Sequence, residues 1–309
     1  MIKLILKSQL RTGMYVESIK GEWVNGGPAA RRLLLKSDHE VARLKAGNFE
    51  GVFINTALGI DVANAVQAAV PTADLAAVEH AIKDAVRNLH IAFEGAIKAK
   101  SVSLGAFEPV VATLKTTVQR HPALLIGMTR LKSKDDVTFV HSVAVSALMM
   151  HFADALELDE ATTKNLGIAG LLHDIGKLSI ASEILNKAGT LGADERRVIQ
   201  DHPIKGHEIL RDAEGVPPVV LDICRHHHER LDGYGYPDRL SGEAISKFVR
   251  MSTICDVFDA VTSVRPYKKP WTTAQAIRWM LSADGVFDRK LLWAFACSLD
   301  LPSETVLAD

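Results

Sequence analysis

Residues 166–178 read LGIAGLLHDIGKL, an apolar stretch interrupted near its end by an adjacent histidine and aspartate, His173 and Asp174. Because the preceding residues are almost all apolar, the stretch predicts a buried helix, and Gly176 favours its end just after the pair. An ionised carboxylate in such a core costs several kcal/mol unless cations or hydrogen bonds compensate it. A metal ion would supply that compensation, and an adjacent His and Asp could share one ion or each reach one of a close pair. The alternative is a neutral His–Asp hydrogen bond with a purely structural role.

The segment STICDVFDAV, residues 252–261, repeats this pattern. Asp256 lies between Cys255 and Val257, in surroundings too apolar for a free carboxylate. Asp259 follows one helical turn later, where it could orient a ligand as an outer partner. We therefore treat Asp256 as a second candidate metal ligand.

Histidines are concentrated in one part of the chain, with eight of the 12 between His141 and His228. A single histidine on an apolar helix is usually a core residue with both nitrogens satisfied, so each one alone is a weak signal. His202 and His207 are five residues apart, a poor match to one helical face, so only one of them is expected at a site. In the run 226–228, successive side chains turn by about 100° on a helix, so two of the three can converge.

The candidate ligands are histidines and carboxylates, and the chain has no cysteine cluster. This combination favours iron, manganese or zinc at a catalytic site. The three cysteines exclude a structural site built from four cysteines, and without CxxC spacing they also argue against a disulfide framework.

The sequence predicts a mainly α-helical protein with three parts. Residues 1–65 mix short β-like runs (KLIL, GMYVESI, GVFIN) with glycine-rich turns, which is typical of a small mixed α/β module. A short helix is expected in it, with Ser37 or Asp38 as N-cap and Gly47 just past its end. Residues 66–106 form a helical connector, and residues 107–309 read as an all-α domain.

The connector is expected to contain one amphipathic helix. Its apolar residues recur at helical spacing at Leu75, Val78, Ile82, Val86 and Leu89. Such a helix packs on a neighbour, so it offers either a homodimer surface or the cover of the all-α domain.

Overall composition excludes several classes of protein. Hydrophobic residues make up 48% of the 309-residue chain and charged residues 24%, which supports a packed core and argues against wholesale disorder. The formal net charge of −1 gives no general attraction to DNA, RNA or an anionic membrane. The chain shows neither a signal core nor an apolar run of the roughly 18 residues needed to span a bilayer, so a soluble cytoplasmic protein is expected.

The motifs together resemble the HD-GYP domain, the bacterial cyclic di-GMP phosphodiesterase branch of the HD superfamily. They are HD at 173–174, HHE at 227–229, DGYGYP at 232–237 and RPY at 265–267, within a resemblance that runs from about 137 to 292. Residues 1–60, with LRTGMYVESI at 10–19, also resemble the module of unknown function often found before such domains. The resemblance implies hydrolysis of cyclic di-GMP at a site of divalent metal ions, with iron or manganese expected.

The resemblance also implies a site, residue by residue. The metal ligands it implies are His141, His173, Asp174, His202, His227, His228 and Asp256. Asp174 would bridge the metals and Lys177 would meet the scissile phosphate. Arg265 and Lys268 would bind the ligand's phosphates, and Tyr236 would form part of the pocket. His207 and His226 are left outside the set.

The sequence departs from the family pattern at one informative position. Members with three metals carry a glutamate four residues before the first histidine ligand, and here that residue is Val137. We therefore expect two metals with a bridging hydroxide between them. For such a site the family pattern implies linear pGpG as the main product. Two alternatives stay open: an HD hydrolase of another nucleotide, and a non-catalytic cyclic di-GMP receptor with protein partners at its N-terminal module.

Overall fold

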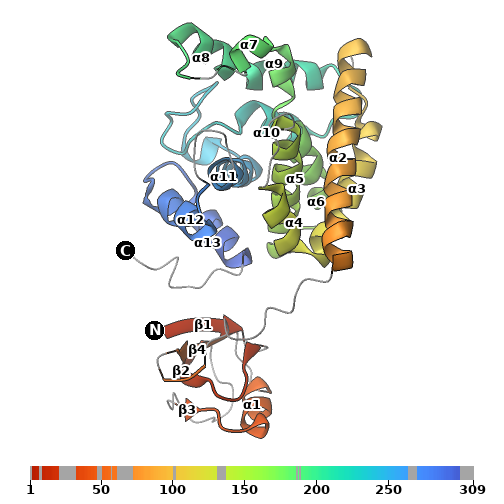
Figure 1. The fold of residues 1–309 in the computed structure, drawn as a ribbon. Helices are drawn as coiled ribbons and strands as arrows, with labels where there is room; N and C mark the ends of the chain where they lie inside the picture. Colours follow the sequence, from red (N-terminus) through yellow and green to blue (C-terminus); the bar gives the residue numbers. More distant parts are fainter. Residues whose placement is uncertain are drawn as a thin grey trace. The chain divides into compact units, whose positions relative to one another are not determined.

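The computed structural model describes residues 2–6, 9–20, 33–46, 51–56, 58–60, 72–99, 102–130, 137–185, 187, 189–263 and 270–299. Its internal contacts divide the chain into two units, residues 1–71 with 300–309, and residues 72–299. Among the described residues, the strands lie in the first unit and the elements of the second are helical, which confirms the predicted fold class (Figure 1).

The first unit is built on a four-stranded antiparallel sheet in the order β1-β4-β2-β3. Its strands are β1 Ile2–Leu6, β2 Tyr15–Lys20, β3 Leu33–Leu34 and β4 Gly51–Asn55. The short helix α1, Asp38–Lys45, accompanies the sheet, and its Val41 joins the core formed by buried strand residues such as Val16 and Ile54.

The predicted start of α1 is correct in detail. Ser37 is the N-cap: its side chain accepts the amide N–H of Glu40, and the Glu40 carboxylate accepts the Ser37 N–H. This reciprocal arrangement satisfies two amide donors that a helix leaves unpaired at its start. The helix ends at Lys45 with Ala46 as C-cap, while Gly47 lies outside the described residues.

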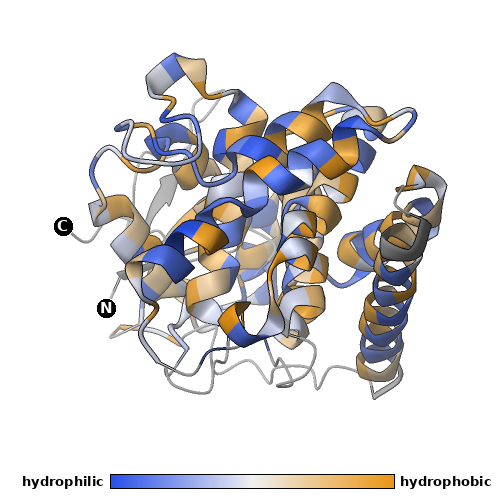
Figure 2. Ribbon diagram, turned by 90° about the horizontal axis from the view of Figure 1, so that it is seen from above, coloured by the Kyte–Doolittle hydropathy of each residue, from blue (hydrophilic) through white to orange (hydrophobic). Residues whose placement is uncertain are grey.

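The second unit is a set of helices packed around one another. Its longer helices are α2 Thr72–Ala99, α3 Glu108–Arg120, α4 Pro122–Thr129, α5 Val137–Ala155, α6 Glu160–Leu172, α8 Ala193–Gln200, α9 His202–Arg211, α10 Pro218–His226, α11 Lys247–Thr262, α12 Thr273–Ser282 and α13 Arg289–Ser298. The short turns are η3 Leu104–Ala106, η4 Ile175–Ser179, α7 Ser182–Leu185 and η5 Gly242–Ala244. Most of these helices carry both hydrophobic and hydrophilic residues, as expected when one face meets a core and another meets water (Figure 2).

The helix predicted in the connector is α2, and it packs against α3, α4 and α5. Its buried stripe differs from the predicted one, because Leu75 is 39% exposed and the stripe begins at Val78. Leu89 lies on the stripe as expected. Ala81 and Ala85 occupy its middle, where their small side chains allow the helix to lie against its neighbours.

Helices α5 and α6 form the centre of the unit, in contact with α10 and α11 (Figure 1). Residues Val143–Met150 of α5 are all buried, and Ser146 Oγ donates to the Gly167 carbonyl of α6 at 2.8 Å. The pairing fixes the end of α6 beside the start of α5. None of the described helices combines the length and the apolar character that a membrane span requires.

Candidate metal centre

The structure brings all seven predicted metal ligands into one region of the second unit. We call them the histidine–aspartate cluster: His141 of α5, His173 and Asp174 after α6, His202 at the start of α9, His227 and His228 after α10, and Asp256 of α11. His228 is partly exposed, and each of the other six is at most 8% exposed. Five elements from separate parts of the chain therefore converge on one buried polar site.

Asp174 lies at the centre of the cluster and contacts it through both oxygens. Its Oδ1 is 3.1 Å from His202 Nε2 and 3.8 Å from His227 Nε2. Its Oδ2 is 3.3 Å from His173 Nε2 and 3.7 Å from His141 Nε2. One carboxylate thus faces two different pairs of imidazoles.

Four of the five histidines are oriented by a hydrogen bond between Nδ1, on the side of the ring away from Nε2, and an oxygen atom. In His173, His202 and His227 the partner is a backbone carbonyl: Gly170 at 2.8 Å, Ile199 at 2.7 Å and Cys224 at 3.1 Å. In His141 it is the carboxylate of Asp259, at 2.6 Å. Because Nδ1–H donates to these oxygens, the Nε2 lone pair is directed into the cluster, which is the arrangement of metal-bound histidines.

Gly176 allows two of the contributing segments to approach closely. A Cβ added at this residue would lie 1.9 Å from the His202 carbonyl oxygen and 2.6 Å from the Gly206 amide nitrogen. Only glycine leaves room for η4 to pass the first turn of α9 at this distance. Helix α6 ends at Leu172, before the His–Asp pair and not just after it as predicted, and Gly176 within η4 allows His202 to lie next to Asp174.

The charges of the cluster are set by its burial and its internal contacts. Burial would raise the pKa of Asp174, but Lys177 and His173 lower it well below its usual range. Burial lowers the pKa of His227 far below normal, and that of His228 to about 3. Burial also opposes charge on His141, but hydrogen bonds to Asp256 and Asp259 raise its pKa to about 9. The cluster thus combines ionised carboxylates with the neutral imidazoles of His227 and His228, which are good metal ligands, and with a protonated His141, whose proton a metal would have to displace.

Two buried polar atoms of the cluster lack hydrogen-bond partners, namely His173 Nε2 and Asp174 Oδ1. His202 Nε2 is close to Asp174 Oδ1, but it is not aligned as a donor. Unpaired buried polar atoms are rare and indicate a missing ion or water. The cluster contains three groups of residues whose ligand atoms all lie within 4.8 Å of one another. These groups are Asp174 with His202, His227 and His228; Asp174 with His141 and His173; and Asp256 with His173 and His227. The donor set therefore fits divalent metal ions.

Comparison with known proteins agrees with this geometry. A family model described as HD domain matches residues 112–291, and one described as a domain of unknown function, DUF3391, matches residues 2–104. The chain belongs to the HD-domain family. The resemblance predicted from the HD, HHE and GYP motifs is confirmed, and the family implies divalent metal binding, which the donor set of the cluster fits.

The HD domain has relatives of known name. The cyclic di-GMP phosphodiesterase PA4108 of Pseudomonas aeruginosa is 39% identical, over 96% of this chain and 76% of that protein. The 3'3'-cGAMP-specific phosphodiesterase 1 of Vibrio cholerae is 43% identical, over 44% of this chain and only 31% of that protein. The solved structure of Bd1817, an HDG"Y"P protein from Bdellovibrio bacteriovorus, matches 97% of this chain with a TM-score of 0.60 at 15% identity, which supports the fold alone.

Of the three cationic residues predicted near the histidine–aspartate cluster, the structure describes Lys177 alone. Lys177 of η4 donates to Asp174 Oδ2 at 2.5 Å, so its ammonium lies directly beside the cluster. Arg265 and Lys268 lie outside the described residues. Their predicted contacts with substrate phosphates stay predictions.

Tyr236, of the GYP sequence, lies directly against the HD site. Its ring centroid is 4.7 Å from that of His228, with the two planes 33° apart. Burial raises the pKa of its phenol, and the charges of Asp256 and Asp174 add to this effect. The phenol therefore stays protonated beside the cluster, and its role in a pocket wall stays a prediction.

The two histidines that were predicted to lie outside the metal set have other surroundings. His226 contacts Asp222 Oδ1 through Nδ1 at 2.7 Å and Asp238 Oδ2 through Nε2 at 2.9 Å. His207 is partly exposed on α9 and belongs to none of the groups that could hold a metal within the described part of the chain.

Glu229 has no predicted role, although it is the last residue of the HHE motif. Glu229 is 1% exposed, and its carboxylate accepts the amide N–H groups of Asp238 and Leu240. Its position immediately after the two cluster histidines was the available signal.

Proposed function

We propose that this chain is a metal-dependent phosphodiesterase that hydrolyses cyclic di-GMP, mainly to linear pGpG. The observation that carries the proposal is the position of Asp174, whose two oxygens face different groups of imidazoles. A relative aligned over nearly the whole chain, the cyclic di-GMP phosphodiesterase PA4108, supports the choice of substrate.

We infer two metal ions rather than one or three. Asp174 would be shared, with His202, His227 and His228 on one side and His141 and His173 on the other, completed by Asp256. Helix α5 begins at Val137, one turn before His141, where members with three metals carry a glutamate. Iron and manganese suit this mixed imidazole and carboxylate set.

When bound, two divalent ions would lower the pKa of a shared water and hold a phosphate oxygen for in-line attack. The protein's own part is to orient the reactants. Asp174 is kept ionised and central, and the Nδ1 contacts of the histidines fix the directions of their Nε2 atoms. Lys177 places an ammonium at the edge of the cluster, where it can offset negative charge that grows on the phosphate oxygens.

Hydrolysis stops at the linear product if the linear dinucleotide leaves before a second attack. The resemblance to the HD-GYP family implies that a site of two metals yields mainly pGpG rather than GMP, and this supports the choice of product. Tyr236 would form one wall of the pocket by offering its ring for stacking on a guanine.

The test is hydrolysis of cyclic di-GMP by protein loaded with iron or with manganese, with products separated by chromatography and metal content measured. We expect pGpG to accumulate and about two metals per chain. Failure to hydrolyse any cyclic dinucleotide at full metal loading would refute the enzymatic proposal and favour the receptor alternative.

A second candidate substrate is 3'3'-cGAMP, because a relative that is 43% identical over 44% of this chain is named for it. Metal ligands act on the phosphate and do not choose between guanine and adenine. Competition between the two dinucleotides in one reaction gives the ratio of kcat/KM directly, and a ratio above one for 3'3'-cGAMP would replace the first substrate with the second.

A further inference from the structure

The loop that carries Tyr236 returns across the end of α10 and is fixed there by a buried carboxylate. Glu229 is 1% exposed and accepts two backbone amides from the far side of the loop, Asp238 N at 2.7 Å and Leu240 N at 3.1 Å. Each of the two amides donates to a different oxygen of the Glu229 carboxylate, so both carboxylate oxygens are engaged. The residue therefore joins the chain just after His228 to the chain just after Pro237.

The same loop is held again through the side chain of Asp238. Arg225 donates to it twice, through Nε at 2.7 Å and through Nη2 at 2.8 Å, and His226 contacts it at 2.9 Å. Such paired bonds from one guanidinium fix orientation as well as distance. Asp238 is thus held at its backbone by Glu229 and at its carboxylate by the end of α10.

Between these anchors the loop lies tightly on the segment that contains the cluster histidines. A Cβ added at Gly235 would lie 2.5 Å from Glu229 Cα and 2.7 Å from the His228 carbonyl oxygen, so glycine is required there. The Tyr236 amide donates to the same carbonyl at 3.3 Å, and the Tyr236 ring lies 4.7 Å from the His228 ring. A shift of the loop would therefore move the Tyr236 ring relative to the cluster.

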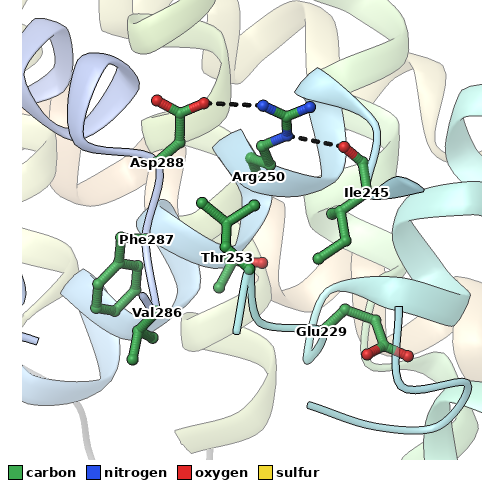
Figure 3. A pocket seen from close by; sticks show the side chains of 8 residues that line it. Glu229, Ile245, Arg250, Thr253, Val286, Phe287 and Asp288 are labelled. Atoms are coloured by element: carbon green, nitrogen blue, oxygen red, sulfur yellow. Dashed lines mark hydrogen bonds and ion pairs between the residues drawn. The ribbon is translucent and has the colours of Figure 1, made fainter. Parts of the chain in front are cut away.

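Glu229 also lines a small cavity, together with Thr253, Arg250 and Asp288 (Figure 3). Arg250 is directed to Asp288 and to the Ile245 carbonyl, as the dashed lines in Figure 3 show. Thr253 donates to the His227 carbonyl at 2.9 Å. The hydrogen bonds of Glu229 thus go to the loop, while the arginine that shares its cavity is engaged elsewhere.

We propose that Glu229 is a positioning residue for substrate binding: its carboxylate holds the loop so that Tyr236 is preorganised as a wall of the pocket. The role in binding rests on the proposed function, whereas the clamp itself is independent of it. A ligand that meets an already fixed wall does not have to order the loop, so the clamp should act mainly on affinity.

The substitution that tests the proposal is Glu229→Gln. The amide has nearly the same shape, but it replaces one acceptor by an NH₂ donor, which would face an amide N–H. We expect KM for cyclic di-GMP to rise about tenfold, the effect of one lost buried hydrogen bond, while kcat and bound metal change less than about twofold. Hydrogen exchange measured on a peptide covering residues 232–242 should quicken in the variant.

A double-mutant cycle separates positioning from general stability. In a Tyr236→Ala background, Glu229→Gln should cause no further rise in KM, because Glu229 acts through that ring. Asp288→Asn is the matched control: Asp288 lines the same cavity and also accepts two backbone amides, from Lys290 and Leu291, but it does not contact the loop. It should leave KM unchanged.

The outcomes are distinguishable. If hydrogen exchange of residues 232–242 is unchanged in Glu229→Gln, the clamp is overturned. If exchange quickens but KM does not change, the positioning role is overturned. The positioning role is also overturned if Glu229→Gln raises KM equally in the wild-type and Tyr236→Ala backgrounds. A wild-type protein that does not hydrolyse cyclic di-GMP overturns the proposed function, and exchange then judges the clamp alone. If Glu229→Gln does not fold, Asp238→Ala tests the same loop through a side chain that is partly exposed.

Discussion

Replacing Asp259 by asparagine should weaken metal binding although Asp259 is not itself in the histidine–aspartate cluster. The Asp259 side chain is 2% exposed, with Oδ2 2.6 Å from His141 Nδ1 and Oδ1 3.1 Å from Ser263 Oγ. An asparagine can keep its oxygen toward His141 and turn its NH₂ toward the Ser263 hydroxyl. The substitution therefore removes mainly the negative charge behind the imidazole.

Two opposing effects of the Asp259 charge determine how much metal affinity the variant loses. Outer partners of metal-bound histidines typically contribute 10–100-fold to affinity, or about 1.4–2.7 kcal/mol. In the metal-free protein, however, Asp259 also helps to raise the pKa of His141 to about 9, so a metal must displace a proton at neutral pH. In the variant this pKa falls and proton competition weakens. The loss of affinity should therefore be small near pH 7 and approach the full range at pH 8.5 and above.

The assay is titration of metal-free protein with Mn²⁺ against a chromophoric chelator between pH 7 and pH 8.5. We expect log K to rise less steeply with pH in Asp259→Asn than in the wild type. Asp222→Asn is the matched control, since Asp222 contacts His226 Nδ1 in the same way at 2.7 Å but serves a histidine outside the cluster. Equal affinities and equal slopes for Asp259→Asn and wild type would refute the orienting role of Asp259.

Three further outcomes follow from the same geometry. Asp174→Ala should lose hydrolysis by orders of magnitude together with bound metal, measured by turnover and metal analysis, and full activity would contradict the bridging role. Tyr236→Ala should weaken cyclic di-GMP binding by about 1–3 kcal/mol in calorimetry with the fold intact, and unchanged affinity would make Tyr236 a packing residue only. The metal-free protein should be most stable near pH 6.5 in urea unfolding. His141 has a folded pKa of about 9 against about 6.5 unfolded, so its stabilisation is full below pH 6.5 and falls by about 3 kcal/mol as pH rises through 9. His228, with a folded pKa of about 3, lowers stability as pH falls from 6.5 toward 3, and a flat profile from pH 6.5 to 9 would contradict the charge assignment.

Local sequence pattern identified the residues whose burial is costly. His173, Asp174 and Asp256 stand in apolar surroundings, and this made them candidate metal ligands, with a structural His–Asp hydrogen bond as the alternative for the first two. Capping chemistry likewise placed the start of α1 at Ser37 or Asp38, and Ser37 accepts the amide there. The N-cap prediction is confirmed, because it depends on neighbours within one turn of the chain, while the role of the three buried residues as metal ligands stays a prediction.

Contacts between distant segments were beyond the same reasoning. His141 and Asp259 are 118 residues apart, and their pairing depends on how α5 lies against α11. The clamp of Glu229 depends on a loop that returns to it nine and eleven residues later. The buried face of α2 was wrongly extended to Leu75, because periodicity gives the spacing of apolar residues but not the point at which the helix loses contact with its neighbours.

The cluster compensates its own charges without a metal, and this has a consequence for folding. Asp174 and Asp256 both have pKa values far below their usual range, while Lys177 and a protonated His141 contact them at 2.5 and 3.0 Å. Each of the two cluster carboxylates therefore contacts a cation, with His141 shared between Asp256 and Asp259, and these contacts limit the penalty of burying carboxylates. The HD unit should thus remain folded when metal is removed, in contrast to small domains whose structure depends on zinc. The His141 proton occupies the place of a cation, and its displacement links metal affinity to pH through the same residue that Asp259 orients.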